Sequence, residues 1–454
     1  MFTSSGWMVA RIVAVSILLI AGITANAWCR DLFVSTTGND SVSYANNSIS
    51  APWATVLKAH QEARAGDTVY FRAGTYPVNS ISTGSYGFHG TAVSPVTFTR
   101  YESENVIWRS TSTNVTIRVG KNHHHYQYLN CVHEPSGSMT GDRGFFQSGY
   151  ETTSDGLWIK YCTFTMNSRG DNYGSIHLKN NEGCTNVEIS HNKIVHTGTS
   201  GSTNSSGIIC FGINTFKINN NEISGPPMGI YLKHANSSVA SEVDGEVRNN
   251  FVKSTTRRAL FCNFNHLLIE NNIIHYDNTG CTEGEVHFNE SNGGPGGDYN
   301  TIRNNTFMTA VWFMEDSGGA IHNVFEGNII AGSGNLWNNH PYASIADYTT
   351  SDYNLFISGP CIKKNGTSYG LSTWKSSIRQ DSHSLSGSPS FVGGPAPSPI
   401  AGYRLAEGSI GKGVGINGAD MGANVSMVGT GGVDIPGGET GPQAPSGLNV
   451  LRQQ

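Results

Sequence analysis

The sequence predicts an all-β fold, a right-handed parallel β-helix in which one chain winds as a solenoid of short stacked strands. A phrase with a central Asn between apolar residues recurs every 22 to 33 residues or so, and a period of this length indicates a solenoid. Each copy alternates Ile, Val and Phe with polar residues over too few positions for a helix. The composition, with 55 Gly and only 13% charged residues, also favours strands and turns.

The repeated phrase is the first element to explain. Its central residues are Asn192, Asn221, Asn250, Asn272, Asn305, Asn328 and Asn354. A chain that bends sharply between two strands often passes through a left-handed residue, a conformation that Asn tolerates. Stacked side-chain amides can also hydrogen-bond from coil to coil, as in cross-β ladders. We therefore expect these residues to be structural.

The two ends of the chain differ from the middle. Arg11, the apolar run 12–20 and the small-x-small site at 25–27 indicate a signal peptide over residues 1–27. Residues 28–430 are expected to form one β-helix domain, because a solenoid grows in one dimension and needs no division. Residues 431–454 are rich in Gly and Pro and predict a flexible tail or linker. The protein is expected to be secreted, to the cell exterior or the periplasm.

Within the domain, residues 53–63 carry apolar side chains (Trp53, Val56, Leu57 and Ala63) at helical spacing. A short helix there would cap the open end of the solenoid, with a strand following at 68–72. Eight cysteines in an exported chain permit disulfides. Cys131 and Cys162 are candidates for a bridge at the turn position, whereas Cys210 and Cys262 are expected to be buried.

The charge balance excludes some partners. The formal net charge is -5 and no basic cluster is present, which argues against nucleic acid and against an anionic membrane surface. The apolar run near the N-terminus is too short to span a bilayer comfortably. We expect no membrane insertion after signal removal, and a monomer.

Three segments carry a resemblance to a known family. Residues 32–41 (LFVSTTGNDS), 51–76 (APWATVLKAHQEARAGDTVYFRAGTY) and 401–423 (AGYRLAEGSIGKGVGINGADMGA) resemble the opening and closing segments of secreted right-handed β-helix proteins of the pectate-lyase-like superfamily. The resemblance implies the fold. It leaves the activity open, because this superfold hosts lyases, hydrolases, epimerases and non-catalytic proteins.

A further strand precedes each Asn phrase, and its alternate side chains should point outward. The inward set is expected to be apolar and to end with Trp312 and Met314. The outward columns read His177, Ile209, Tyr231, Phe261, His287 and Phe313, and then Lys179, Phe211, Lys233, Asn263, Asn289 and Glu315. Coils about 4.8 Å apart could track a polysaccharide along the axis. The expected substrate-binding residues are His177, Lys179, Phe211, His234, Phe261, Asn263, Asn289 and Phe313; the alternative is that exposed aromatic residues here bind nothing.

Lys233 is the leading candidate for chemistry. GIYLK at 229–233 followed by VRNN at 247–250 resembles the chondroitinase B and alginate lyase branch of these proteins. That resemblance implies Lys233 as the base that removes the proton beside a sugar carboxylate, with Tyr231 and His287 as candidate proton donors. The alternative is an ordinary surface lysine.

The motif departs from that branch at two points. Residues 226–228 (Pro-Pro-Met) replace the branch's calcium-binding Glu residues, and Asn263 stands where the branch has an Arg, while Arg257 and Arg258 lie nearby but out of register. The residue-level match to that branch is therefore partial, and it does not imply a calcium-dependent mechanism of that type.

Acidic residues form a second candidate group. Glu290, Glu315 and Asp316 could bind calcium or act as acid and base in glycoside hydrolysis; the alternative is solvated loop charges. Residues 123–125, three consecutive His, are expected to form a polar turn. The sequence thus predicts a protein that cleaves an acidic polysaccharide by β-elimination. A glycoside hydrolase, or a non-catalytic carbohydrate-binding or cell-surface β-helix, is the alternative.

Overall fold

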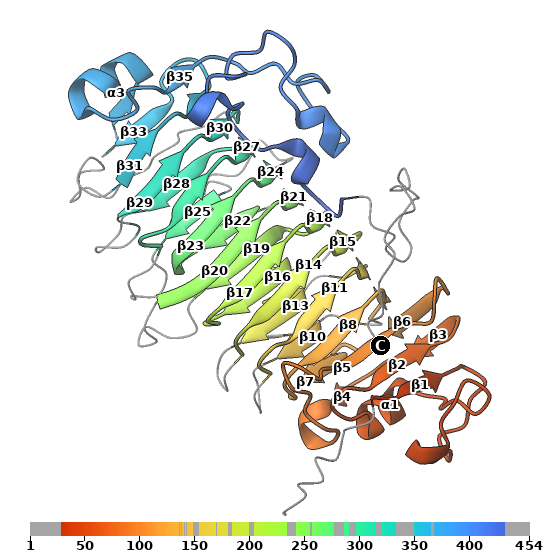
Figure 1. Cartoon of the computed structure of the whole chain (residues 1–454). Coiled ribbons are helices and arrows are strands. Elements are labelled where there is room, and N and C mark those ends of the chain that lie inside the picture. The colour runs from red at the N-terminus through yellow and green to blue at the C-terminus, as the bar shows by residue number, and fades with distance from the viewer. Residues whose placement is uncertain are drawn as a thin grey trace, which may run out of the picture.

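The computed structural model (Figure 1) is a parallel β-helix, as predicted. It describes residues 29–431 except 136, 138, 140, 142, 149–153, 169, 180–183, 199–203, 234–241, 255–256, 277–285, 290–296, 315–319, 321, 333–348 and 365–366. The expected signal peptide and nearly all of the expected tail lie outside the described residues. Three parallel sheets run along the solenoid, and successive strands of the chain visit them in turn.

The first sheet has twelve strands within the described residues. They are β1 (Asp31–Val34), β2 (Thr68–Phe71), β5 (Val96–Arg100), β8 (His124–Gln127), β11 (Trp158–Lys160), β14 (Val187–Ser190), β17 (Phe216–Asn219), β20 (Glu242–Arg248), β23 (Asn265–Glu270), β26 (Thr301–Arg303), β29 (Asn323–Glu326) and β31 (Thr349–Asp352).

The second sheet also has twelve strands in the described part of the chain. They are β3 (Gly74–Pro77), β6 (Val106–Ser110), β9 (Asn130–His133), β12 (Thr163–Met166), β15 (Lys193–His196), β18 (Glu222–Ser224), β21 (Phe251–Ser254), β24 (Ile273–Tyr276), β27 (Thr306–Met308), β30 (Ile329–Ile330), β32 (Leu355–Phe356) and β35 (Leu385–Ser386).

The third sheet carries the strands that precede the Asn phrases. They are β4 (Ile81–Ser82), β7 (Ile117–Val119), β10 (Arg143–Ser148), β13 (Tyr173–Lys179), β16 (Ser206–Phe211), β19 (Met228–Lys233), β22 (Leu260–Cys262), β25 (Val286–Asn289) and β28 (Val311–Met314). A hairpin of β33 (Ile362–Lys364) and β34 (Thr367–Tyr369) lies outside these sheets.

The predicted Asn ladder is present at the turn between the first and second sheets. The Asn250 side chain donates from Nδ2 to Ile218 O at 2.7 Å and to Asn272 Oδ1 at 3.0 Å, and its Oδ1 accepts the Asn221 N–H at 2.9 Å. The left-handed residue of each turn is the one before the ladder Asn, for example Asn249 with a φ of 57°. The ladder Asn therefore acts through its side-chain amide. The left-handed conformation predicted for it is adopted by the residue before it.

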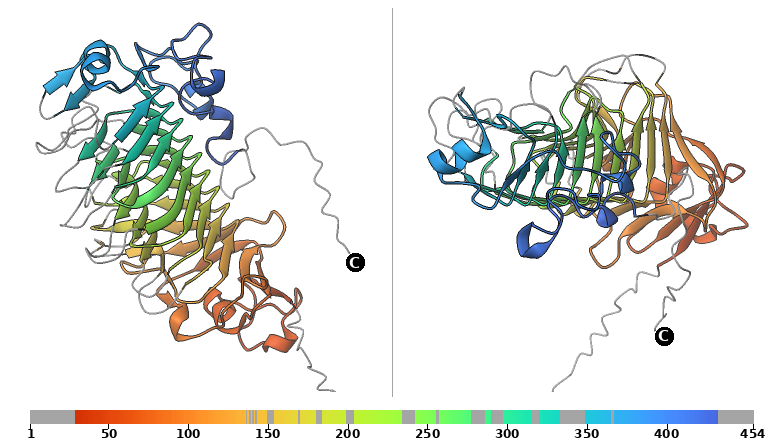
Figure 2. Two further views of the ribbon diagram at one scale, coloured as in Figure 1. Left: turned by 60° about the vertical axis from the view of Figure 1, so that its left-hand side comes forward. Right: turned by 90° about the horizontal axis from the view of Figure 1, so that it is seen from above.

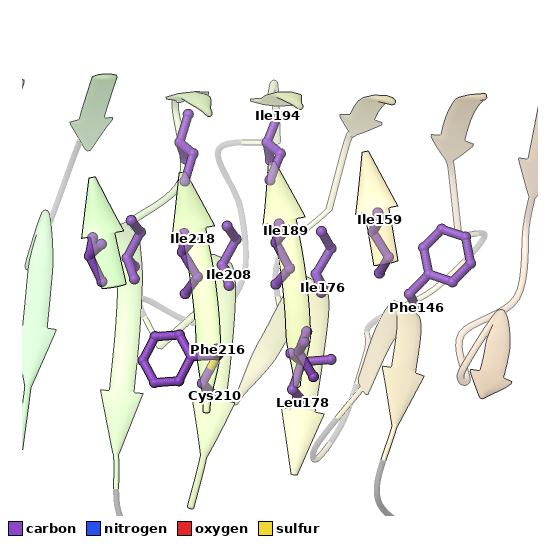
Figure 3. Close-up of a cluster of buried hydrophobic side chains, with 14 of the residues drawn as sticks. Phe146, Ile159, Ile176, Leu178, Ile189, Ile194, Ile208, Cys210, Phe216 and Ile218 are labelled. Atoms are coloured by element: carbon purple, nitrogen blue, oxygen red, sulfur yellow. The ribbon is translucent and has the colours of Figure 1, made fainter. Parts of the chain in front are cut away.

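The core fills the space between the three sheets (Figure 3). Ile176 and Ile208 of the third sheet align across neighbouring coils, as do Ile189 and Ile218 of the first sheet, and all four are buried. Apolar side chains that stack in register from coil to coil remove almost all of their surface from water. The solenoid is stabilised mainly by this burial.

The last strand of the third sheet corrects one prediction. Phe313 of β28 aligns with Phe288 and stacks on it with ring centroids 4.8 Å apart, inside the core. The predicted register placed Trp312 and Met314 inside and Phe313 outside, and a slip of one residue reverses both faces. Since all four residues of β28 are apolar, their pattern could not fix the register.

Helices and turns close the N-terminal end. The predicted capping helix is α1 (Val56–Glu62), and its N-cap Thr55 accepts the Lys58 N–H at 3.1 Å. Val56, Ala59 and His60 are buried, but Leu57 is exposed, so its place on the apolar face was wrong. Short 3-10 turns lie nearby at η1 (Tyr44–Asn46) and η2 (Thr83–Ser85).

The C-terminal segment turns back along the solenoid after α3 (Leu371–Ile378). It contains η3 (Ile400–Tyr403), η4 (Ile416–Gly418) and η5 (Val425–Met427), and Figure 2 shows it in dark blue beside the coils. Asn220 donates from Nδ2 to Met427 O at 2.8 Å, and Asn271 donates to Asn424 O at 3.3 Å. The segment therefore packs on the turn that carries the Asn ladder.

The described cysteines are all free thiols. Cys131 aligns with Phe164 in the second sheet, whereas Cys162 is at the ladder position and donates its N–H to Asn192 Oδ1 at 3.0 Å. The two cysteines are thus out of register, and the proposed bridge is absent. Cys210 and Cys262 are buried, as predicted. Among the described residues, none of the helices combines the length and apolar character needed to span a membrane.

Candidate active site

The outer face of the third sheet brings most of the first predicted column together. His177, Ile209, Tyr231, Phe261 and His287 occupy one register position on five neighbouring strands. The parallel ladder spaces these positions by about 4.8 Å. The sequence pattern therefore predicted the register of these five strands correctly.

The second column is shorter than expected. Lys179, Phe211 and Lys233 align on β13, β16 and β19, and both lysines are partly exposed. Asn263 follows the end of β22 and is fully buried, with its N–H donating to Leu232 O at 3.1 Å. Asn289 is in β25, but its side chain is not among those described. The other predicted residues here, His234, Glu290, Glu315 and Asp316, lie outside the described residues.

Burial corrects the prediction of open aromatic platforms for sugar rings. The exposed fraction is 0% for His177, 1% for Phe261 and 7% for both Phe211 and Tyr231. The rings cover one another, with Phe211 edge-on to His177 at 5.2 Å and Tyr231 against Phe261 at 4.8 Å. Aromatic side chains on adjacent coils are close enough to pack together, so little ring surface remains for a ligand. Together with Ile209 and Met228, Phe211, Tyr231 and Phe261 form a hydrophobic cluster separate from the core.

Two arginines reach this face from just before β22. The Arg258 guanidinium lies 5.0 Å from the centroid of the Phe261 ring. Arg257 donates from Nη1 to Asn204 Oδ1 at 3.0 Å, and Asn204 in turn donates to Asp171 Oδ1 at 3.1 Å. The sequence placed both arginines out of register with the columns. Their side chains are long enough to reach the columns nonetheless, which strand alternation alone does not reveal.

The electrostatic environment separates the roles of Tyr231 and His287. Burial lowers the pKa of His287 well below its usual value, and the nearby Arg258 and Arg257 lower it further. Burial raises the pKa of Tyr231, and the same two cations oppose that increase. At neutral pH His287 is therefore an uncharged imidazole and Tyr231 a protonated phenol. Tyr231 fits the predicted proton donor, whereas His287 is not available as a charged acid.

Calcium does not fit the described residues beside Lys233. Pro226 and Pro227 precede β19 and Met228 is its first residue; none of the three has a side-chain oxygen, and calcium prefers several oxygen ligands. No group of three or more His, Cys, Asp or Glu suited to a metal occurs among the described residues.

Comparison with known proteins gives a limited sequence match and a general likeness of fold. No protein-family model matches the chain. A 93-residue stretch is 34% identical to pectate lyase PEL9 of Emericella nidulans, over 20% of this chain and 21% of that protein. The match therefore spans about a fifth of the curated relative's length.

Solved β-helix enzymes are similar at low identity. The crystal structure of pectate lyase Pel9A is 11% identical, with a TM-score of 0.41 over 88% of this chain and 97% of that chain. A mannuronic-acid-specific family 6 polysaccharide lyase from the human gut microbiota is 13% identical, with a TM-score of 0.42 over 68% and 73%. At these TM-scores the structural similarity gives no information about the site of this protein. The parallel β-helix architecture rests on the strand topology described above.

Proposed function

We propose that this protein cleaves an acidic, uronate-containing polysaccharide by β-elimination on the outer face of the third sheet. The observation that carries the proposal is a group of basic side chains on this face. Arg257 and Arg258 act electrostatically on the phenol of Tyr231, Lys233 lies two residues beyond Tyr231 on β19, and Lys179 shares the column of Lys233 two coils away. A uronate lyase needs positive charge to neutralise the sugar carboxylate, a base and a proton donor. This face offers all three kinds of group.

The reaction assigns one role to each group. Lys233 acts as an uncharged amine, a form that the positive charge of Arg257 and Arg258 on the same face favours. This amine takes the proton from the carbon beside the carboxylate, and the electron pair forms a carbon–carbon double bond as the bond to the glycosidic oxygen breaks. The leaving oxygen takes the proton of Tyr231, which bulk water then restores. Arg258 pairs with the carboxylate while negative charge develops on it.

The match to a pectate lyase in sequence supports the same class of reaction. We further propose that the substrate is met outside the cell, in keeping with the expected signal peptide. The experiment that follows identifies which uronate-containing polysaccharide is the substrate.

The test is incubation of the protein with polygalacturonate, alginate and chondroitin sulfate while following the ultraviolet absorbance of the unsaturated uronate. We expect absorbance to rise with one of the three, and Lys233→Ala to lower kcat by at least about 100-fold. Lys217→Ala, an exposed lysine in β17 of the first sheet, is the matched control and should leave kcat unchanged. New reducing ends without absorbance would instead indicate hydrolysis, and retention on immobilised glycan without turnover would indicate binding alone.

A further inference from the structure

A groove of about 790 Å³ lies between the C-terminal segment and the turn that joins the first and second sheets. The solenoid forms one wall, and residues of 403–405 and 416–427 form the other. In a coil with three sides this corner is opposite the third sheet, so the groove is separate from the candidate active site. Its volume is within the range typical of small-ligand sites.

The floor of the groove is a column of alternating charges. Arg248, Glu270, Arg303 and Glu326 share one register position on β20, β23, β26 and β29. The buried carboxylate of Glu270 pairs with Arg248 at 2.6 Å and with Arg303 at 2.7 Å. Arg303 uses only its Nε in that pair, and 40% of its side chain is exposed. Its terminal nitrogens therefore remain available to a ligand.

Other polar groups of the groove have no partner among the residues that the structure describes. Glu326 and Arg404 line it, and neither makes an ion pair or a side-chain hydrogen bond. The side-chain amides of Asn304 and Asn417 line it as well, and they too make no hydrogen bond. A guanidinium, a carboxylate and two amides thus face one cavity without internal contacts. Arg404 and Asn417 are exposed, and Asn304 and Glu326 are partly exposed, so water solvates these groups and a polar ligand in the groove would replace that water.

We propose that this groove is a second, non-catalytic binding site for a short acidic oligosaccharide. Each uronate ring carries one carboxylate beside several hydroxyls. Arg404 is the cation that pairs with the carboxylate, while Glu326 and the amides of Asn304 and Asn417 hydrogen-bond the hydroxyls. The choice of a uronate rests on the proposed function, whereas the groove itself does not.

A second site would hold one part of a long polysaccharide while another part reaches the third sheet. Binding at one site raises the effective concentration of the chain at the other, without any new contact at the reacting bond. Loss of the groove should therefore raise the KM for polymer and leave the turnover of a short oligomer unchanged.

The test uses calorimetric titration of tetragalacturonate and tetramannuronate into the Lys233→Ala/Arg258→Ala chain, in which the candidate active site is weakened. We expect one remaining site per chain for the tetramer that binds. Adding Arg404→Ala or Glu326→Ala should weaken it at least about tenfold, since each removes a charged partner. The matched control is Arg109→Ala, a half-exposed arginine of β6 whose pair with Glu134 spans 3.9 Å, which should leave the affinity unchanged.

Two results would overturn the inference: neither tetramer binds to the background variant, or the affinity survives both Arg404→Ala and Glu326→Ala. Turnover without binding in the groove would refute this site and leave the proposed function standing. Binding that depends on Arg404, in a chain that eliminates nothing, would support the site and refute the proposed function.

Discussion

Replacing one ladder residue, Asn250→Ala, should cost about 4 kcal/mol of stability. Its side chain makes four buried hydrogen bonds, to Ile218 O at 2.7 Å, to Asn272 Oδ1 at 3.0 Å, and from the N–H and Nδ2 of Asn221 at 2.9 and 3.0 Å. Each buried group left without a partner costs about 1 to 3 kcal/mol. Water entering the gap would recover part of the sum, which brings the expected loss to about 4 kcal/mol.

The matched control is Asn249→Gly, one residue earlier. Asn249 is partly buried and has a φ of 57°. Its side chain accepts a hydrogen bond from Asn271 at 2.8 Å and donates a long one to Asn220 at 3.4 Å. Glycine adopts this conformation without steric cost, and solvent can replace the two lost contacts. The expected loss is below about 1 kcal/mol.

Urea unfolding would give the stability of both variants, and hydrogen exchange would locate the effect. Because each coil of a solenoid contacts mainly its neighbours, amide exchange should accelerate most in β17, β20 and β23. If Asn250→Ala lost less than about 1 kcal/mol, or no more than Asn249→Gly, the buried hydrogen bonds of the ladder would not contribute to stability as expected.

Three further outcomes are expected. Burial lowers the pKa of His60 to about 4 and that of His124 to about 3. Both histidines therefore take up protons more readily when the chain is unfolded. The free energy of unfolding should fall as pH drops from about 6.5 towards 3, by about 3 kcal/mol for His60 alone. A melting temperature that stayed constant across that pH range would contradict this. Gly229→Ala should destabilise by about 3 kcal/mol because its Cβ would lie 2.1 Å from Val252 Cγ1, and an unchanged urea midpoint would argue against it. Gly370→Ser should stabilise by about 0.5 kcal/mol, since the N-cap of α3 makes no side-chain hydrogen bond, and thermal melting is the measurement that decides.

Local patterns in the sequence were enough to predict the winding. The recurring Asn, the alternation of apolar residues around it and the helical spacing near Val56 each depend on neighbouring positions, so they could be interpreted without coordinates. The outer column from His177 to His287 followed from the same alternation. The pattern gave the wrong register at β28, because all four residues there are apolar and the sequence does not show which of them point inward.

The tertiary structure decided what those columns can do. Phe211, Tyr231 and Phe261 point away from the core, but neighbouring coils bring their rings into contact, and this packing buries them. Arg258 joins the site through the reach of its side chain, and the groove beside Arg404 exists only because a segment about 100 residues or more downstream folds back on the coils. The sequence by itself determined the repeat, because hydrogen bonding and burial within a coil are local. Only the folded chain decided which polar groups meet, because those contacts join residues far apart in the sequence.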